Sequence, residues 1–134
     1  MRFKLSYPNS DSIELNLSND RLPSHVVSIG PVKCNYMLNE QSDYYCLTLE
    51  TDCQLILCCQ RCMESFEYHY HNNTQLGLCY EETVAEQIMS ILDPIVLVAD
   101  EIPFETLIID ELYLYLPLFH KNEAICQTNL SDLN

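Results

Sequence analysis

The sequence predicts an α+β fold. A single domain, residues 1–134, is expected to hold an antiparallel β meander or barrel-like sheet, with one or two helices of the C-terminal half packed on it. Two patterns predict this: polar and apolar residues alternate with a period of two through residues 31–80, whereas helical spacing begins only after residue 83. Strands first and helices later are typical of α+β folds. With 134 residues, 48% of them hydrophobic, the chain is long enough to bury one core.

The first part of the chain is expected to form two strands. Residues 2–7 alternate, and residues 13–17 place an apolar side chain at every second position. Asn19-Asp20 indicates a turn after the second strand, and Pro23 interrupts the segment that follows.

The middle of the chain is expected to form most of the meander. Strands are predicted at residues 32–38, 44–51, 53–59, 64–71 and 74–80, because aromatic and aliphatic side chains recur there at every second position. The fourth of these strands has two distinct faces, Phe66, Tyr68 and Tyr70 on one and Glu67, His69 and His71 on the other. Polar turns are predicted between them at residues 39–43 and at Asn72-Asn73.

A first helix is predicted from the sequence Thr83-Val84-Ala85-Glu86, which fits a capping box and is followed by apolar residues at helical spacing. It should end at Asp93-Pro94, because the residue before a proline disfavours the α conformation. Residues 94–99 then have the continuous apolar character of a short buried strand.

A second helix is predicted with Pro103 in its first turn. Its apolar face is marked by Phe104, Ile108, Leu112, Leu116 and Phe119. Acidic residues lie off that face: Glu105, Asp110 and Glu111. Pro117 should stop the helix at about Leu116, and the polar residues 121–134 are expected to form a flexible tail.

The chain is strongly acidic, with 20 Asp and Glu against 6 Lys and Arg and a net charge of −14. Eleven of the acids and only one base, Lys121, fall in residues 81–134. Because a phosphate backbone repels such a surface, direct binding of RNA or DNA is disfavoured. A basic protein partner suits this charge, and solubility alone also explains it.

Other functional classes are restricted by what the sequence contains. Its 2 glycines, Gly30 and Gly77, are isolated, so no glycine-rich phosphate-binding loop is present. No apolar run approaches the roughly 20 residues that span a bilayer, and the basic start lacks the apolar segment of a signal peptide. A cytoplasmic protein with reduced cysteines and no membrane partner is therefore predicted.

Cys59 and Cys62 form the most informative local motif, a C-x-x-C between two predicted strands. A structural zinc site needs four ligands. No second C-x-x-C exists, Cys126 lies alone near the C-terminus, and His69 and His71 are too far along an extended strand to complete the site. A thioredoxin-like redox motif belongs at a helix start, not between strands. The pattern therefore favours a turn with half-buried thiols.

The remaining chemically active side chains have structural interpretations. The other cysteines are expected to pack as small apolar residues: Cys34, Cys46, Cys53, Cys58 and Cys79. His25 and His120 have no catalytic constellation near them in sequence and are expected on the surface. Asp110 and Glu111 could be paired catalytic acids, but a solvated helix face explains them better. No enzyme is predicted.

Two separated motifs together resemble a known family. Cys59-Gln60-Arg61-Cys62 and Phe66 are followed, about forty residues later, by Asp110-Glu111-Leu112, Leu116-Pro117-Leu118 and His120. This pattern resembles the YceD family, whose members are called large ribosomal RNA subunit accumulation proteins. The resemblance covers about residues 30–126, with 30–120 as the core, and residues 1–29 match it loosely.

The resemblance implies a cytoplasmic factor needed for the accumulation of large-subunit ribosomal RNA, in assembly or processing, and it implies no catalytic activity. Many relatives carry a second cysteine cluster after the Leu-Pro-Leu segment that would complete a zinc site. This chain has only Cys126 there, and its spacing from Leu118 to His120 is shorter than in the family pattern. No cofactor is therefore expected, although Cys59 and Cys62 remain the candidate zinc ligands.

Two classes of function follow. The first is a non-enzymatic ribosome biogenesis factor that contacts a basic ribosomal protein or assembly factor, and ribosomal RNA only indirectly, through its acidic C-terminal half and the turn around Arg61. Such a complex should weaken in high salt. The second is a thiol- or zinc-dependent module in which Cys59 and Cys62 are the working residues. A metal-dependent nuclease is a third idea that rests only on the abundance of Asp and Glu.

Overall fold

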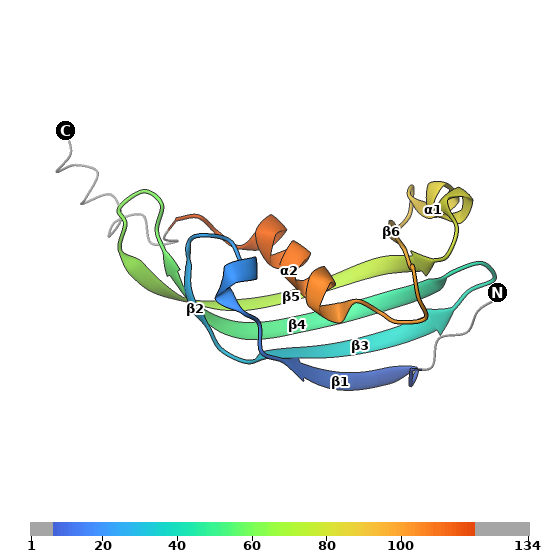
Figure 1. Cartoon of the computed structure of the whole chain (residues 1–134), viewed down its shortest axis with the longest axis horizontal. Helices are drawn as coiled ribbons and strands as arrows, with labels where there is room; N and C mark the ends of the chain where they lie inside the picture. The colour runs from blue at the N-terminus through green and yellow to red at the C-terminus, as the bar shows by residue number, and fades with distance from the viewer. Residues whose placement is uncertain (1–6, 120–134) are drawn as a thin grey trace. The chain divides into compact units, whose positions relative to one another are not determined.

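The computed structural model of the chain describes residues 7–119 and confirms an α+β fold (Figure 1). A six-stranded, mostly antiparallel open sheet carries two α-helices. Residues 2–6 of the strand expected at residues 2–7, and the tail expected at residues 121–134, lie outside the described range, and Tyr7 itself is not part of a strand. Neither helix within that range is long and apolar enough to cross a membrane.

The strands are β1 (Ser10–Leu15), β2 (Val26–Ile29), β3 (Val32–Glu40), β4 (Tyr45–Cys58), β5 (Ser65–Cys79) and β6 (Asp93–Val96). Their order in the sheet is β1-β3-β4-β5-β6, and β2 pairs separately with β4. A short 3-10 helix, η1 (Asn19–Arg21), precedes β2. The two α-helices are α1 (Glu82–Ile88) and α2 (Phe104–Tyr115).

Two breaks expected in the meander are absent. Strand β4 runs for 14 residues through the position where residues 51 and 53 were expected to separate two strands, and β5 runs for 15 residues through Asn72-Asn73. The turn preference of an asparagine pair is weak compared with a continuous pairing between neighbouring long strands, so tertiary context overrides local propensity. The sheet therefore has fewer and longer strands than expected.

Two features of the sheet were not predicted. Strand β2 pairs antiparallel with the end of β4, Val26 opposite Leu57 and Ile29 opposite Leu55, with a register shift between Val26 and Ser28. Strand β6 pairs with β5 in parallel, where a meander predicts antiparallel pairing. Parallel pairing requires a crossover connection, and α1 lies within that connection.

Helix α1 begins and ends earlier than the sequence indicates. Its N-cap is Glu81, which makes no side-chain capping bond, so the capping box at Thr83 is wrong. The helix ends at Ile88, well before Pro94, and the amides of Ile91 and Leu92 both donate to the Ile88 carbonyl. This tight turn lets the chain enter β6 at Asp93.

Helix α2 agrees with its predicted end and, at Ile108, Leu112 and Leu116, with its predicted face, whereas Phe119 lies beyond the helix and is exposed. Ile108 and Leu112 are fully buried, and the helix stops at Tyr115, two residues before Pro117. Proline has no amide hydrogen and clashes with the preceding turn, which explains the stop.

The contacts divide the chain into two compact units, which are described separately. The first contains residues 33–51 and 71–104 and the described part of 1–14. Three aromatic rings pack in its core. The Tyr36 and Phe104 centroids are 5.0 Å apart, and Tyr7 packs edge-on against both. The Tyr7 hydroxyl also accepts a hydrogen bond from the Ile102 amide at 3.0 Å.

The second unit contains residues 15–32 and 52–70 and the described part of 105–134. Its section of β4 has two faces, because strand side chains alternate. Cys53, Leu55 and Leu57 are buried on what we call the covered face, the side on which the Tyr70 hydroxyl meets α2. Asp52, Gln54, Ile56 and Cys58 lie on the opposite side, which we call the open face.

Candidate interaction site

The turn between β4 and β5 is closed by its own backbone. The Cys59 amide donates to the Glu64 carbonyl at 2.9 Å, and the Met63 amide donates to the Cys59 carbonyl at 2.8 Å. Met63 adopts φ 65°, a left-handed conformation that favours glycine. The C-x-x-C motif is therefore part of a tight turn between strands, as the sequence indicates.

The segment that follows α2 lies against this turn. The Gln60 amide donates to the Leu118 carbonyl at 2.8 Å. The Arg61 guanidinium lies over the Phe119 ring, 4.8 Å from its centroid, at a distance typical of a cation–π contact. We call the turn 59–64 and the segment 116–119 together the motif cluster. Two motifs that are about forty residues apart in sequence thus meet in space.

His25 also contacts the segment that follows α2. Its Nε2 lies 3.0 Å from the Pro117 carbonyl oxygen and donates to it, and its own carbonyl accepts a hydrogen bond from the Cys58 amide at 2.7 Å. The expectation that His25 lies on the surface is therefore wrong. The residue is only 6% exposed, because its imidazole satisfies a carbonyl beyond the end of α2 that lacks a helical partner.

The two motif cysteines differ in burial. Cys59 is fully buried, whereas Cys62 is half-buried, which fits a turn with packed thiols. Within residues 7–119, no group of three or more His, Cys, Asp and Glu side chains is arranged to hold a metal ion. Cys126, the remaining cysteine, lies outside those residues.

The other cysteines divide between the interior and partly exposed positions. Cys34, Cys53 and Cys79 are buried, and Cys46 and Cys58 are partly exposed. Burial, with the nearby Asp52 and Glu111 carboxylates adding to it, raises the pKa of the Cys53 thiol to about 12. Burial also raises the pKa of Cys79. Because the thiolate is the reactive form, these two side chains suit packing better than chemistry.

Glu111 corrects another expectation. Only its neighbour Asp110 is solvated, whereas Glu111 is 5% exposed and accepts a hydrogen bond from the buried Tyr70 hydroxyl at 2.6 Å. The side of α2 that faces the sheet is thus wider than the apolar stripe that the sequence marks. A buried carboxylate needs such a donor, since burial without one is costly. The pair Asp110-Glu111 therefore does not present two adjacent solvent-facing acids.

The other family-motif residues fall into three groups. Leu112 and Leu116 are buried, and Phe66 and Pro117 are partly exposed. Leu118 is exposed, and His120 lies outside the described residues. Around the cluster several large apolar side chains meet solvent: Met63, Tyr113, Leu114, Tyr115, Leu118 and Phe119. Aromatic residues, methionine and arginine are the types enriched at protein interfaces, so this composition suits partner binding.

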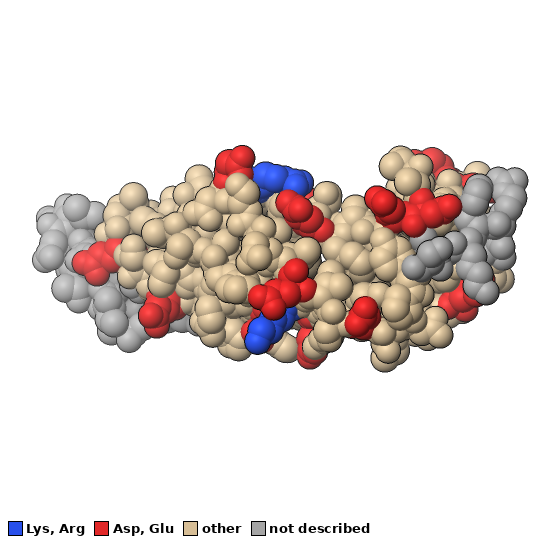
Figure 2. Space-filling view, turned by 60° about the horizontal axis from the view of Figure 1, so that its bottom comes forward, with Lys and Arg blue, Asp and Glu red and all other residues tan. Residues whose placement is uncertain are grey.

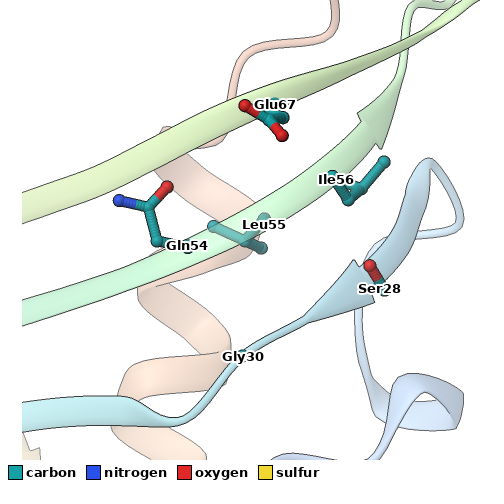
Figure 3. A pocket seen from close by; sticks show the side chains of 6 residues that line it. All are labelled: Ser28, Gly30, Gln54, Leu55, Ile56 and Glu67. Carbon is teal, nitrogen blue, oxygen red and sulfur yellow. The ribbon is translucent and has the colours of Figure 1, made fainter.

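The open face carries a hollow of about 300 Å³ (Figure 3). Its lining comes from β2, β4, β5 and the link between β2 and β3, namely Ser28, Gly30, Gln54, Leu55, Ile56 and Glu67. The Gly30 amide donates to the Gln54 carbonyl at 2.9 Å, which fixes the link beside β4. The alternation of residues 64–71 correctly placed Glu67 on the exposed side. The pairing of β2 with β4, which completes the hollow, has no local sequence signal.

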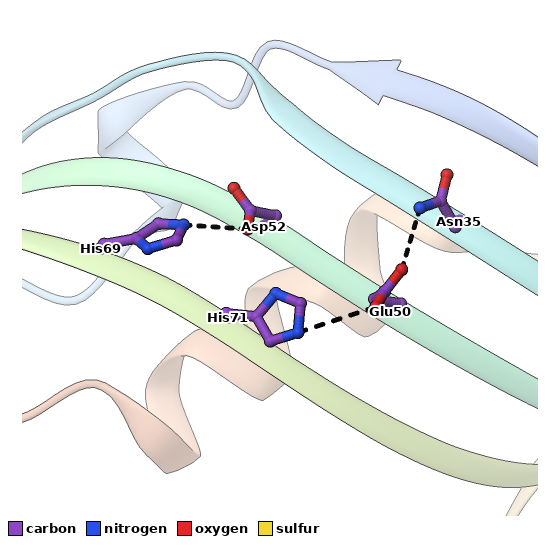
Figure 4. A network of polar contacts seen from close by, with 5 residues as sticks. All are labelled: Asn35, Glu50, Asp52, His69 and His71. Atoms are coloured by element: carbon purple, nitrogen blue, oxygen red, sulfur yellow. Dashed lines mark hydrogen bonds and ion pairs between the residues drawn. The ribbon is translucent and has the colours of Figure 1, made fainter.

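Histidine–carboxylate pairs join β4 and β5 (Figure 4). In the second unit, His69 Nε2 lies 2.9 Å from Asp52 Oδ2. In the first unit, His71 Nε2 lies 3.7 Å from Glu50 Oε2, and the Asn35 amide donates to Glu50 Oε1 at 3.0 Å. His69 and His71 are thus engaged by carboxylates on the neighbouring strand, as cross-strand neighbours on one face of a sheet can be.

Acidic side chains are spread over the face that Figure 2 presents, and basic ones are few. In the described part of the second unit, seven acidic residues stand against two basic ones, Arg21 and Arg61. Arg21 forms an ion pair with Glu105 at 2.8 Å, and Arg61 covers Phe119. This unit therefore presents an excess of negative charge, which attracts cationic partners.

No family model, no curated protein and no solved structure matches the chain. The functional conclusion therefore depends on the motif cluster, the open face and the charge, and the likeness to the YceD family stays a prediction.

Proposed function

We propose that this protein is a non-enzymatic ribosome biogenesis factor of the cytoplasm, needed for the accumulation of large-subunit ribosomal RNA. It would act by holding a basic ribosomal protein or assembly factor and would contact ribosomal RNA only indirectly. The single observation that carries the proposal is the motif cluster. Gln60 and Arg61 of the first motif contact Leu118 and the adjacent Phe119 at the second. Motifs that serve one surface are expected to meet in this way.

The chemistry of the cluster supports binding in preference to catalysis. Its buried thiol, Cys59, is packed in the turn, and the carboxylate of Glu111 on α2 is hydrogen-bonded to Tyr70. What remains at the surface is an arginine with large apolar side chains. Such groups contribute contact area and desolvation to a protein interface.

The charge supports the choice of partner. A net charge of −14 opposes close approach to a phosphate backbone and favours a basic protein. The accumulation of large-subunit ribosomal RNA would then depend on the basic protein that this factor holds or delivers. The complex should lose affinity as ionic strength rises, because screening shortens the reach of surface charges.

The thiol- or zinc-dependent module remains the alternative. It requires Cys59 and Cys62 to act chemically, and the partial exposure of Cys62 is the observation in its favour. The complete burial of Cys59 favours the packing role.

Deletion of the gene tests the proposal. We expect a selective fall in the ratio of large- to small-subunit ribosomal RNA, with a deficit of large subunits in gradient profiles. An unchanged ratio would contradict the proposal. Complementation then assigns the surface: Arg61→Ala should restore the ratio only partly, while Lys33→Ala, which removes an exposed base on β3, should restore it fully.

The same deletion strain distinguishes the thiol- or zinc-dependent module from the proposed function. A Cys59→Ser, Cys62→Ser double variant that folds should still restore the ratio if the thiols only pack. Loss of complementation by this variant, with the fold intact by circular dichroism, would instead favour the thiol module. The zinc content of the purified protein completes this test.

A further inference from the structure

The hollow on the open face has polar groups with unused bonding capacity. Within residues 7–119, the side chains of Glu67, Gln54 and Ser28 make no hydrogen bond or ion pair with another side chain or backbone group. They surround a space of about 300 Å³, at the lower limit of the sizes typical of ligand pockets. The space suits one side chain or a group of similar size, and is small for a nucleotide.

The charge of the hollow indicates a cation. Among the described residues that line it, Glu67 alone carries a charge. Both basic residues in the described part of this unit are engaged elsewhere, Arg21 with Glu105 and Arg61 with Phe119. The nearby strand carboxylate Asp52 is engaged by His69. Glu67 is therefore the acid of this face that is left for a partner's positive charge.

We propose that this hollow receives an arginine side chain from a basic segment of the partner protein, with the Glu67 carboxylate as its counter-ion. The inference rests on the proposed function, because it specifies the partner of the same protein. A guanidinium presents several donors in a planar fork that matches a carboxylate in a bidentate manner. The Gln54 side-chain oxygen and the Ser28 hydroxyl offer further acceptors, which a compact ammonium group uses less well.

The apolar part of the lining fits the rest of an arginine side chain. Ile56, whose side chain lies on the open face, supplies apolar lining between the polar groups. The aliphatic stem of arginine can pack against such a surface while its head group meets the acid. Gly30 contributes no side chain, so its place in the lining stays open.

Gly30 also provides a way to close the hollow. A Cβ added there would meet only the Gln54 carbonyl oxygen, at 3.5 Å, which is an ordinary contact. The position has no left-handed backbone conformation that would strain a larger residue. Gly30→Leu should therefore fold and fill part of the space, whereas Glu67→Gln removes the charge and keeps the shape.

The test is a titration of the full-length 15N-labelled protein, followed by two-dimensional NMR. The probe is the blocked peptide acetyl-Gly-Arg-Gly-amide. The neutral control is the same peptide with citrulline, which has nearly the shape of arginine but no charge. We expect saturable shifts of the Ser28, Gly30 and Glu67 amide signals with arginine and none with citrulline. Absence of saturation with arginine, or equal shifts with citrulline, would overturn the proposal.

Variants locate the binding. Glu67→Gln should weaken the arginine peptide about three- to tenfold, within the range for an ion pair near the surface, and Gly30→Leu should abolish the saturable shifts. The matched control is Glu86→Gln, which neutralises an exposed carboxylate on α1 and should change nothing. Unchanged affinity in Glu67→Gln would overturn the assignment of the counter-ion.

Two further probes define the ligand. Acetyl-Gly-Lys-Gly-amide should bind more weakly than the arginine peptide, and equal affinity would overturn the choice of arginine. Free arginine, in which the α-ammonium offsets the α-carboxylate, should also bind, and absence of binding would overturn the guanidinium as the recognised group. Failure of this inference is distinct from failure of the proposed function. The NMR result does not depend on the ribosomal RNA ratio, and a complementing Glu67→Gln strain would leave the assembly role intact.

Discussion

Two neighbouring residues of β5 place similar chemistry on opposite sides of one strand. On the covered face, the Tyr70 hydroxyl donates to the Glu111 carboxylate, and both residues are at least 95% buried. On the open face, His69 meets the Asp52 carboxylate while roughly half of the histidine side chain stays in solvent. A carboxylate contact supports the fold where water is excluded, whereas the energy of the same kind of contact at the surface is small.

The largest expected difference between the two faces is in packing. Leu57→Ala on the covered face should lower the free energy of unfolding by about 2–5 kcal/mol, because it opens a cavity around a fully buried side chain. Ile56→Ala, one residue earlier on the open face, should cost about 1 kcal/mol or less, since water fills the space. Urea unfolding of both variants measures the difference, and equal losses would break the distinction between the faces.

The buried Cys53 thiol on the covered face makes the free energy of unfolding depend on pH. Its thiol pKa is raised to about 12 in the fold from 9.0, so the folded state keeps a proton that the unfolded chain releases. Its contribution to stability is complete below pH 9 and is lost as the pH rises toward 12. The slope from one proton is at most about 1.4 kcal/mol per pH unit.

The free energy of unfolding should therefore fall as the pH rises, which urea unfolding measured between pH 8 and 11 tests. Cys53→Ala should remove part of the alkaline loss of stability. Cys53 is buried, whereas Cys58 on the open face of the same strand is partly exposed. The same contrast applies to labelling by a thiol reagent under native conditions, in which Cys58 should react well before Cys53. A slope insensitive to Cys53→Ala would contradict the assignment.

The two polar pairs should differ by a smaller amount. Tyr70→Phe leaves the buried Glu111 without this donor and should lower the free energy of unfolding by about 1–3 kcal/mol. His69→Gln removes a solvent-exposed contact with Asp52 and should cost less than about 1 kcal/mol. Urea unfolding of the two variants and of Tyr70→Phe combined with Glu111→Gln measures both effects. A loss for His69→Gln as large as that for Tyr70→Phe would show that the open-face pair is also structural.

The sequence predicts features that depend on neighbouring residues. The alternation at residues 64–71 placed His69 and Tyr70 on their correct faces, and the spacing of Ile108 and Leu112 gave the buried side of α2. The positions that it missed depend on distant partners. Glu111 is buried because Tyr70 is there to donate to it, and His25 is buried because Pro117 returns to it. No local pattern identifies such partners, since each arises when separate segments pack.

The order of the sheet was missed for the same reason. The apolar run of residues 94–99 predicts a buried strand, but the strand ends at Val96 and is only partly buried. Its parallel register, Leu76 opposite Asp93 and Cys79 opposite Val96, depends on where the connection through α1 returns the chain. The hollow on the open face likewise exists only because β2 pairs with β4. The alternation therefore gives the chemistry of each face, and the pairing decides which side chains become neighbours.

The smallest expected effect concerns the motif cluster. Arg61→Ala removes a cation–π contact with Phe119 at a partly exposed site and should lower the free energy of unfolding by only about 0.5–1 kcal/mol. Urea unfolding measures this loss, with Lys33→Ala as the control for removal of a basic residue. A small loss of stability together with poor complementation would place the role of Arg61 in binding. A loss above about 2 kcal/mol would instead make Arg61 part of the support of the turn, like Tyr70 on the covered face.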